Sequence, residues 1–164
     1  YGEFLEIDWA RERAMLELDI ITLTHMTKLF TADMVKRNFG FVLQIASIGA
    51  YQPSPLYASY SAAKSYVLNF GEALNYELRK TRVRCTVLSP GVTRTEFLDV
   101  SGQSPTLYQR MVMMKSRDVT RIGIDAMLRG RSSIVPGIFN SITAWSNRLM
   151  PRRLSAALAY RLMA

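Results

Sequence analysis

The hydrophobic positions of the chain form short continuous runs that alternate with longer stretches of helical spacing. The continuous runs are residues 41–47, 82–88 and 132–135. Runs of this length between turn residues are typical of strands that are buried on both faces, as in parallel sheets. The sequence therefore predicts three parallel strands, which end near Ser47, Ser89 and Val135.

The stretches between these runs have the periodicity of helices. The expected helices cover residues 7–36, 58–80 and 118–130, with two more in the tail 138–164, separated at Pro151. The first is long for a single helix and predicts a kink. Its expected apolar stripe consists of Leu16, Ile20, Leu23, Met26 and Leu29. Asp8 and Asp118 are candidate N-caps. Strands that alternate with helices predict the α/β class.

Length and composition indicate one globular domain. The chain has 164 residues, of which 49% are hydrophobic, and a net charge of +8. No nucleic-acid-reading motif accompanies the positive charge, so nucleic acid is not expected as a partner. Much of the excess comes from Arg148, Arg152, Arg153 and Arg161. An anionic surface or a phosphate-bearing ligand is the milder interpretation.

Cysteine and histidine content narrow the chemistry further. Cys85 is the only cysteine and lies in an apolar strand pattern, which predicts a buried structural thiol in a reducing, cytoplasmic compartment. His25 is the only histidine, so a Ser/His/Asp or Cys/His nucleophile is not expected, and no ligand cluster predicts a metal. The sequence contains no run of about 18 apolar residues, so it predicts no membrane-spanning helix.

The segment from Ser47 to Lys64 carries the strongest candidate chemistry. Tyr60 and Lys64 are four residues apart in a predicted helix and therefore share one face. An ammonium group at this distance stabilises a phenolate and makes tyrosine a useful acid and base. Ser47 follows a strand, where parallel sheets carry their chemistry, and could bond the same substrate oxygen.

Spacing alone does not establish this site, because a Tyr-x-x-x-Lys pair arises easily by chance. Tyr76 and Lys80 have the same spacing, and Ala63, not a serine, lies thirteen residues before Tyr76. For this second pair a solvated helix end is the better interpretation. The first pair differs because strand, serine, loop and helix occur together.

With these motifs the chain resembles the short-chain dehydrogenases/reductases. The resemblance rests on Ser47, on Tyr60-x-x-x-Lys64 and on the segment Ser89-Pro90-Gly91-Val92-Thr93-Arg94-Thr95. It implies the C-terminal part of a doubly wound, Rossmann-like parallel sheet with three strands and flanking helices. In the family, a glycine-rich phosphate-binding turn and the first four strands would precede Tyr1. The chain, residues 1–164, is therefore interpreted as a partial catalytic domain.

The resemblance also implies a reaction and its residues. An NAD- or NADP-dependent oxidoreductase would interconvert an alcohol and a ketone or aldehyde. Tyr60 would be the acid in reduction and the base in oxidation. Lys64 would lower the pKa of Tyr60 and bond the nicotinamide ribose, and Ser47 would hold the substrate oxygen. Asp19 stands where the family has an asparagine that holds a relay water. A carboxylate can still hold water, but its charge would pair with Lys64 and disfavour the tyrosinate. The alternative interpretation of Asp19 is a charge on the helix surface.

Further cofactor contacts are implied for the segment after the second strand. The nicotinamide would meet Tyr60 and Lys64, and the expected additional contacts are Pro90, Gly91, Val92, Thr93 and Thr95. Without the resemblance, Pro90-Gly91 reads as a plain strand-to-loop turn.

Substrate and partners are predicted more coarsely. Residues 98–115, with Met111, Met113 and Met114, are either a lid over a small hydrophobic carbonyl or alcohol substrate or an amphipathic core helix. The family resemblance implies a homo-oligomer through the long helices. The basic amphipathic tail 138–164 could cover the active-site mouth, pack on a partner subunit or rest on anionic lipid.

Two other functions stay open from sequence alone. The chain could be an inactive structural fragment or interaction module, because it lacks a phosphate-binding turn. It could also be a peripheral membrane protein that binds through its basic tail.

Overall fold

Three parallel strands form the centre of the molecule. The computed structural model describes residues 1–163, and of Asp99 the backbone alone. The strands are β1 (Gly40–Ile45), β2 (Val83–Leu88) and β5 (Ser133–Ile134), in the order β1-β2-β5. Ile45 pairs with Leu88, and Leu88 pairs with Ile134, so the three carboxyl ends lie at one edge. The predicted α/β class and parallel strands are confirmed.

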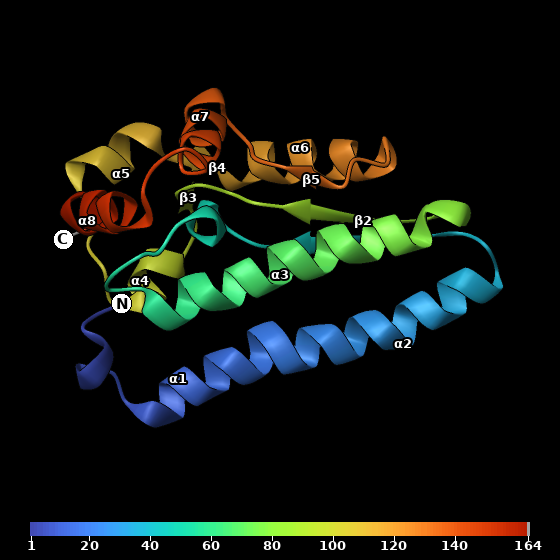
Figure 1. Cartoon of the computed structure of the whole chain (residues 1–164), viewed down its shortest axis with the longest axis horizontal. Helices are drawn as coiled ribbons and strands as arrows, with labels where there is room; N and C mark the ends of the chain where they lie inside the picture. Colours follow the sequence, from blue (N-terminus) through green and yellow to red (C-terminus); the bar gives the residue numbers. More distant parts are fainter. Residues whose placement is uncertain (164) are drawn as a thin grey trace.

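Helices cover both faces of this sheet. The helices are α1 (Trp9–Leu16), α2 (Leu23–Lys36), α3 (Ala58–Glu77), α4 (Phe97–Ser101), α5 (Leu107–Val112), α6 (Ser116–Leu128), α7 (Ile138–Ser146) and α8 (Arg152–Met163). In Figure 1, α3 and the α1–α2 helix lie on one side of the strands and α6 lies on the other. The break in the tail at Pro151 is as predicted. Asp118 lies inside the first turn of α6 and does not cap it, because that helix begins at Ser116.

The first helix, in which a kink was expected, contains a π-helical turn. The π turn η2 (Glu17–Thr22) joins α1 to α2 within one continuous helix, which Figure 1 shows along the lower edge. Asp8 stands at the N-cap, but its side chain makes no capping hydrogen bond. A π turn inserts backbone into the helix and is frequent at functional sites.

The apolar stripe expected on this helix is wrong in its second half. Met26 and Leu29 are exposed, whereas Thr27 and Thr31 are buried. Thr27 tolerates burial because its hydroxyl donates to the Leu23 carbonyl at 2.7 Å and accepts from the Gln44 amide at 3.2 Å. A partnered threonine therefore faces the core where the pattern predicted methionine.

The core lies between α3 and the sheet. Val67 of α3 and Val83, Cys85 and Val87 of β2 are fully buried. Gly71 allows close contact, because a β-carbon there would clash with Val87 and lie 2.6 Å from the Gln44 side-chain oxygen. Burial raises the pKa of the Cys85 thiol to about 12, so this cysteine is an inert core residue, as predicted.

A second, two-stranded sheet was not predicted. Its strands are β3 (Thr93–Arg94) and β4 (Met114–Lys115), which pair in parallel. Two-residue strands have no periodicity that a sequence pattern could show. Residues 98–115 had two interpretations, a lid or an amphipathic core helix. The core-helix interpretation is wrong for Met111 of α5, because its side chain is exposed.

Candidate active site

Ser47 lies where the carboxyl ends of β1 and β2 meet. It is the N-cap of the short helix η3 (Ile48–Tyr51), and its Oγ accepts a hydrogen bond from the Gly49 amide at 3.1 Å. The loops after the two strands are tied together, because the Ile48 amide donates to the Pro90 carbonyl at 2.9 Å. The Ser47 hydroxyl is thus fixed at its oxygen and keeps its own proton available for donation.

Tyr60 and Lys64 project from the first two turns of α3. The Lys64 Nζ lies 5.6 Å from the centre of the Tyr60 ring. It donates to the Ile45 carbonyl at 3.3 Å, which anchors it at the end of β1. The helix thus carries both side chains to the same sheet edge as Ser47.

Asp19 completes this cluster from the π turn. Its carboxylate lies 3.1 Å from the Lys64 Nζ, and both side chains are largely buried, with 18% and 12% of their surface exposed. The predicted ion pair between Asp19 and Lys64 is present. The structure therefore brings together all four residues predicted as catalytic: Ser47, Tyr60, Lys64 and Asp19.

The surroundings of Tyr60 favour the protonated form of its side chain. Burial, foremost, raises the pKa of Tyr60, the Ser47 hydroxyl lowers it, and the negative charge of Asp19 raises it, with a net value of about 12. At neutral pH the side chain is a phenol. The expected disfavouring of the tyrosinate by Asp19 agrees with this direction.

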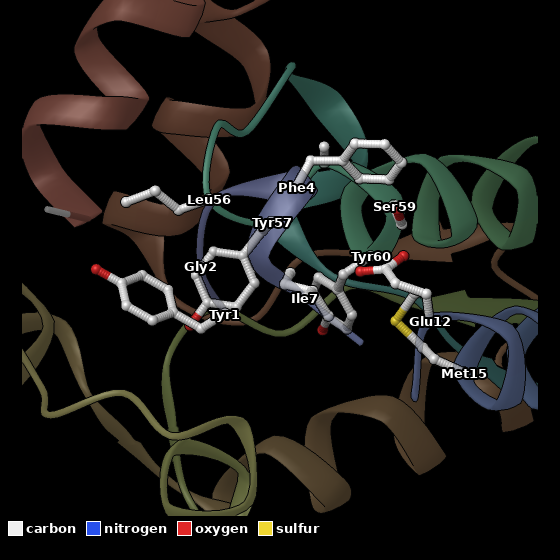
Figure 2. A pocket seen from close by; sticks show the side chains of 11 residues that line it. Tyr1, Gly2, Phe4, Ile7, Glu12, Met15, Leu56, Tyr57, Ser59 and Tyr60 are labelled. Carbon is white, nitrogen blue, oxygen red and sulfur yellow. The ribbon is translucent and has the colours of Figure 1, made fainter. Parts of the chain in front are cut away.

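Aromatic side chains enclose Tyr60. The ring centre of Tyr57 lies 5.8 Å from that of Tyr60, and the ring centre of Phe97 lies 5.5 Å away. Tyr57, Tyr60 and Glu12 line a small pocket of about 50 Å³ together with the N-terminal segment. Figure 2 shows these side chains. Glu12 is buried, and one of its carboxylate oxygens has no hydrogen-bond partner among the described residues.

Sequence reasoning missed these neighbours of Tyr60. Phe97 lies far from Tyr60 in sequence, and no spacing rule connects them. Tyr57 could have been noticed, because it lies three residues before Tyr60 and so shares its side of the helix start.

The segment predicted to meet a nicotinamide lies beside Ser47 and leads into the small sheet. The Val92 carbonyl accepts from the Met114 amide at 3.0 Å. The Thr93 hydroxyl donates to the Gly91 carbonyl at 3.0 Å, and the Thr95 hydroxyl accepts from the Phe97 amide at 3.3 Å. These bonds fix the path of the backbone, and the cofactor contacts of the segment stay a prediction.

Buried glutamines link the following segment to the Tyr60 region. The Tyr57 hydroxyl donates to the Gln103 side-chain oxygen, which also accepts from the Gln109 amide at 3.1 Å. The Gln103 amide donates to the Met163 carbonyl at 3.0 Å. The residues after β3 and the end of α8 are therefore held against the start of α3.

Other candidates do not form a site. His25 is exposed, and no group of three potential metal ligands occurs among residues 1–163. Tyr76 is also exposed, and it stacks with Arg79 at 4.1 Å from the guanidinium carbon to the ring centre. The Tyr76–Lys80 pair thus fits the solvated helix end that was expected.

Comparison with known families agrees with this geometry. A sequence model of the family described as short chain dehydrogenase matches residues 1–105, more than half of the chain. The chain belongs to the short-chain dehydrogenase family. The predicted membership is confirmed, and with it the Rossmann-like origin of the sheet.

Individual relatives of this short-chain dehydrogenase chain are distant. Dehydrogenase/reductase SDR family member 4 of Bos taurus is 29% identical over 64% of this chain and 38% of its own length. An uncharacterized oxidoreductase of Myxococcus xanthus is 24% identical over 95% of this chain and 60% of its own. Human 17-beta-hydroxysteroid dehydrogenase type 3 is 28% identical over 82% of this chain and 44% of its own length. The chain thus spans between 38% and 60% of these relatives' lengths.

Solved structures share the fold along nearly the whole chain. A 7beta-hydroxysteroid dehydrogenase superposes with a TM-score of 0.83 at 17% identity, covering 97% of this chain and 62% of its own. A short chain dehydrogenase from Burkholderia cenocepacia in complex with NADP superposes with a TM-score of 0.77 at 26% identity. The match covers 99% of this chain and 66% of that protein's chain.

Among the described residues of this chain, no helix is both long and apolar enough to cross a membrane.

Proposed function

We propose that the protein is an NAD- or NADP-dependent oxidoreductase that interconverts an alcohol and a ketone or aldehyde. One observation carries this proposal. Tyr60 and Lys64, on one face of α3, meet Ser47 at the carboxyl edge of the parallel sheet, next to the Pro90–Thr95 segment. A phenol, an ammonium and a hydroxyl at one such edge suit proton transfer to a carbonyl oxygen.

The residues present fit a nicotinamide cofactor. An ammonium has three N–H donors. Lys64 uses two of them, toward the Ile45 carbonyl and the Asp19 carboxylate, which leaves the third for a ribose hydroxyl. Pro90, Gly91, Val92, Thr93 and Thr95 would hold the nicotinamide side. Relatives solved with NADPH and with NADP support this choice. When bound, the cofactor supplies the hydride.

The side chains of this chain would then handle the proton. Tyr60 is protonated at neutral pH and would donate its phenolic proton to the substrate oxygen during reduction. The Ser47 hydroxyl would donate a second hydrogen bond to the same oxygen and withdraw charge from it. In oxidation the same atoms work in reverse, with Tyr60 as the base.

Asp19 would act through Lys64. Its ion pair holds the ammonium in place and offsets part of the positive charge that would favour a tyrosinate. This arrangement suits reduction, which starts from the phenol, better than oxidation. Asp19 would also hold the relay water in place of the family's asparagine.

The substrate and assembly are proposed from the site's surroundings. Tyr57 and Phe97 flank Tyr60 with apolar surface, which suits a small hydrophobic carbonyl or alcohol. We also propose a homo-oligomer through the α1–α2 helix, whose exposed large apolar residues include Leu18, Ile21 and Phe30. A reducing, cytoplasmic compartment fits the single buried thiol of Cys85.

The Tyr60→Phe variant tests the proposal. We expect kcat/KM for ketone reduction to fall by about 10²- to 10⁴-fold, because the proton donor is removed while the ring stays. The protein is expressed together with any segment that is encoded upstream, and it is assayed with NADH and with NADPH. Tyr76→Phe is the matched control, since it removes the same hydroxyl from the exposed Tyr76–Lys80 pair, and should leave the rate unchanged.

Two outcomes would contradict the proposal. Equal rates for Tyr60→Phe and the wild type would remove Tyr60 from the chemistry. Failure of the folded protein to bind either cofactor in a calorimetric titration would favour the alternative of an inactive structural or interaction module.

A further inference from the structure

The helix α7 is turned with its large apolar side chains outward. It packs against the molecule through Asn140 and Ala144, which are both buried. The opposite side carries exposed apolar residues at helical spacing, and they continue one turn beyond the helix end. These residues are Ile138, Phe139, Ile142, Trp145 and Leu149, between 57% and 73% exposed. A stripe of this length on a single helix marks an interaction surface.

The positive charge of the tail lies in the segment that continues the chain from this stripe. Asp125 is the last acidic residue of the chain, so the tail 138–164 has no acidic side chain. Its four arginines are exposed, and none forms an ion pair among the described residues: Arg148, Arg152, Arg153 and Arg161. The Ser155 hydroxyl of α8 donates to the Asn147 side-chain oxygen at 2.6 Å and fixes α8 beside the end of α7.

We propose that the α7 stripe and these four arginines form a docking surface for an anionic phospholipid bilayer. The large apolar residues would enter the boundary between headgroups and acyl chains, where tryptophan is favoured. The arginines would bind the headgroup phosphates. The surface requires no spanning helix, and it is a second function beside the proposed oxidoreductase chemistry.

The charge argues for lipid over a second copy of this chain. Two copies that met through this surface would bring eight arginines together without a carboxylate from either tail, and like charges in contact repel. An anionic bilayer neutralises the same arginines and covers the apolar stripe at once. Apolar area and charge thus favour the same partner.

Sedimentation with vesicles tests the charge. We expect the purified protein to bind vesicles of phosphatidylcholine and phosphatidylglycerol in equal parts, and pure phosphatidylcholine far more weakly. Replacing both Arg152 and Arg153 by Gln should weaken binding to the anionic vesicles about 30-fold. The matched control is Arg79→Gln with Lys80→Gln, an adjacent pair of exposed cations just beyond the C-terminal end of α3, and should bind as the wild type does.

A second pair of variants tests the stripe. Ile142→Ser should weaken vesicle binding about fivefold, whereas Leu128→Ser on α6 should not, although the two side chains are 57% and 59% exposed. Trp9→Phe leaves Trp145 as the only tryptophan. Its fluorescence should then be quenched by brominated acyl chains in anionic vesicles.

The proposal fails if the folded wild type does not bind anionic vesicles, if neutral and anionic vesicles bind equally, or if the Arg152/Arg153 variant binds as its control does. It also fails if sedimentation velocity shows a dimer that Ile142→Ser dissociates, because the stripe would then contact a second copy. Circular dichroism confirms that each variant is folded. None of these measurements depends on catalysis.

Discussion

Tyr60 has two neighbours with opposite effects on its proton. The Ser47 hydroxyl lowers its pKa, whereas the Asp19 carboxylate raises it, and burial outweighs both. Lys64, which would favour the tyrosinate, is bound to Asp19 at 3.1 Å. The carboxylate of Asp19 therefore contributes to how readily Tyr60 ionises, although Asp19 lies on a different helix.

We expect Asp19→Asn to lower the pKa of Tyr60 from about 12 by about one unit, because the amide keeps a contact to Lys64 but carries no negative charge. The tyrosinate then forms at lower pH, and the pH at which alcohol oxidation rises moves down with it. Ultraviolet difference titration, with Asp19→Asn/Tyr60→Phe as the reference, isolates Tyr60 from the other tyrosines.

Asp33→Asn is the control for this titration, since Asp33 pairs with Lys36 at 3.0 Å on the exposed surface of the same helix. It should leave the ionisation of Tyr60 unchanged. A pKa that rises in Asp19→Asn, or an equal change in both variants, would show that the Asp19 charge does not act on Tyr60.

At the scale of elements, α3 both fills the core and presents the reactive face. Val67 and Gly71 face the sheet, while Tyr60 and Lys64 face its carboxyl edge. The distance between α3 and β2 therefore determines where Tyr60 stands. Gly71 sets that distance, because its missing side chain makes room for Val87 and Gln44.

Gly71→Ala should destabilise the fold by about 1–3 kcal/mol, because overpacking outweighs the gain in helix propensity of about 1 kcal/mol. Urea denaturation measures the change in the free energy of unfolding. Asn69→Ala, on the exposed side of α3, gains helix propensity without a clash and should be neutral or stabilising. A stabilised Gly71→Ala protein would show that α3 can move away from β2 without cost.

At the scale of the whole molecule, large apolar residues remain exposed along the outer side of the α1–α2 helix. Leu18, Ile21, Leu29 and Phe30 belong to this set. Large exposed apolar surfaces on soluble proteins often mark interaction sites. This surface is separate from the α7 stripe. We propose a second copy of the chain as the partner of the α1–α2 helix and anionic lipid as the partner of the α7 stripe.

Ile21→Asp should dissociate the proposed oligomer, because a charge at the centre of this apolar surface would be buried without a partner. Sedimentation velocity measures the loss of mass. Leu128→Asp is the control, since Leu128 is similarly exposed on α6, and should leave the mass unchanged. A wild-type protein that sediments as a monomer at all concentrations would contradict the assembly.

The sequence by itself determined the elements and the residues that share a face. Three strands, the helix with Tyr60 and Lys64, the break at Pro151 and the burial of Cys85 all follow from periodicity or turn residues. Strand and helix geometry is constant, so spacing along the chain fixes which side chains point the same way. The shared face of Tyr60 and Lys64 was predictable for this reason, whereas the addition of Ser47 rested on strand, serine, loop and helix occurring together and on the family resemblance.

The tertiary structure alone decided what lies opposite those side chains. The contact of Tyr60 with Phe97, the pairing of β3 with β4, the π turn and the outward apolar side of α7 have no local signal. Each depends on segments far apart in sequence or on which face of a helix finds a partner. Packing selects that face by the fit of the whole molecule, so Thr27 is buried where Met26 was expected.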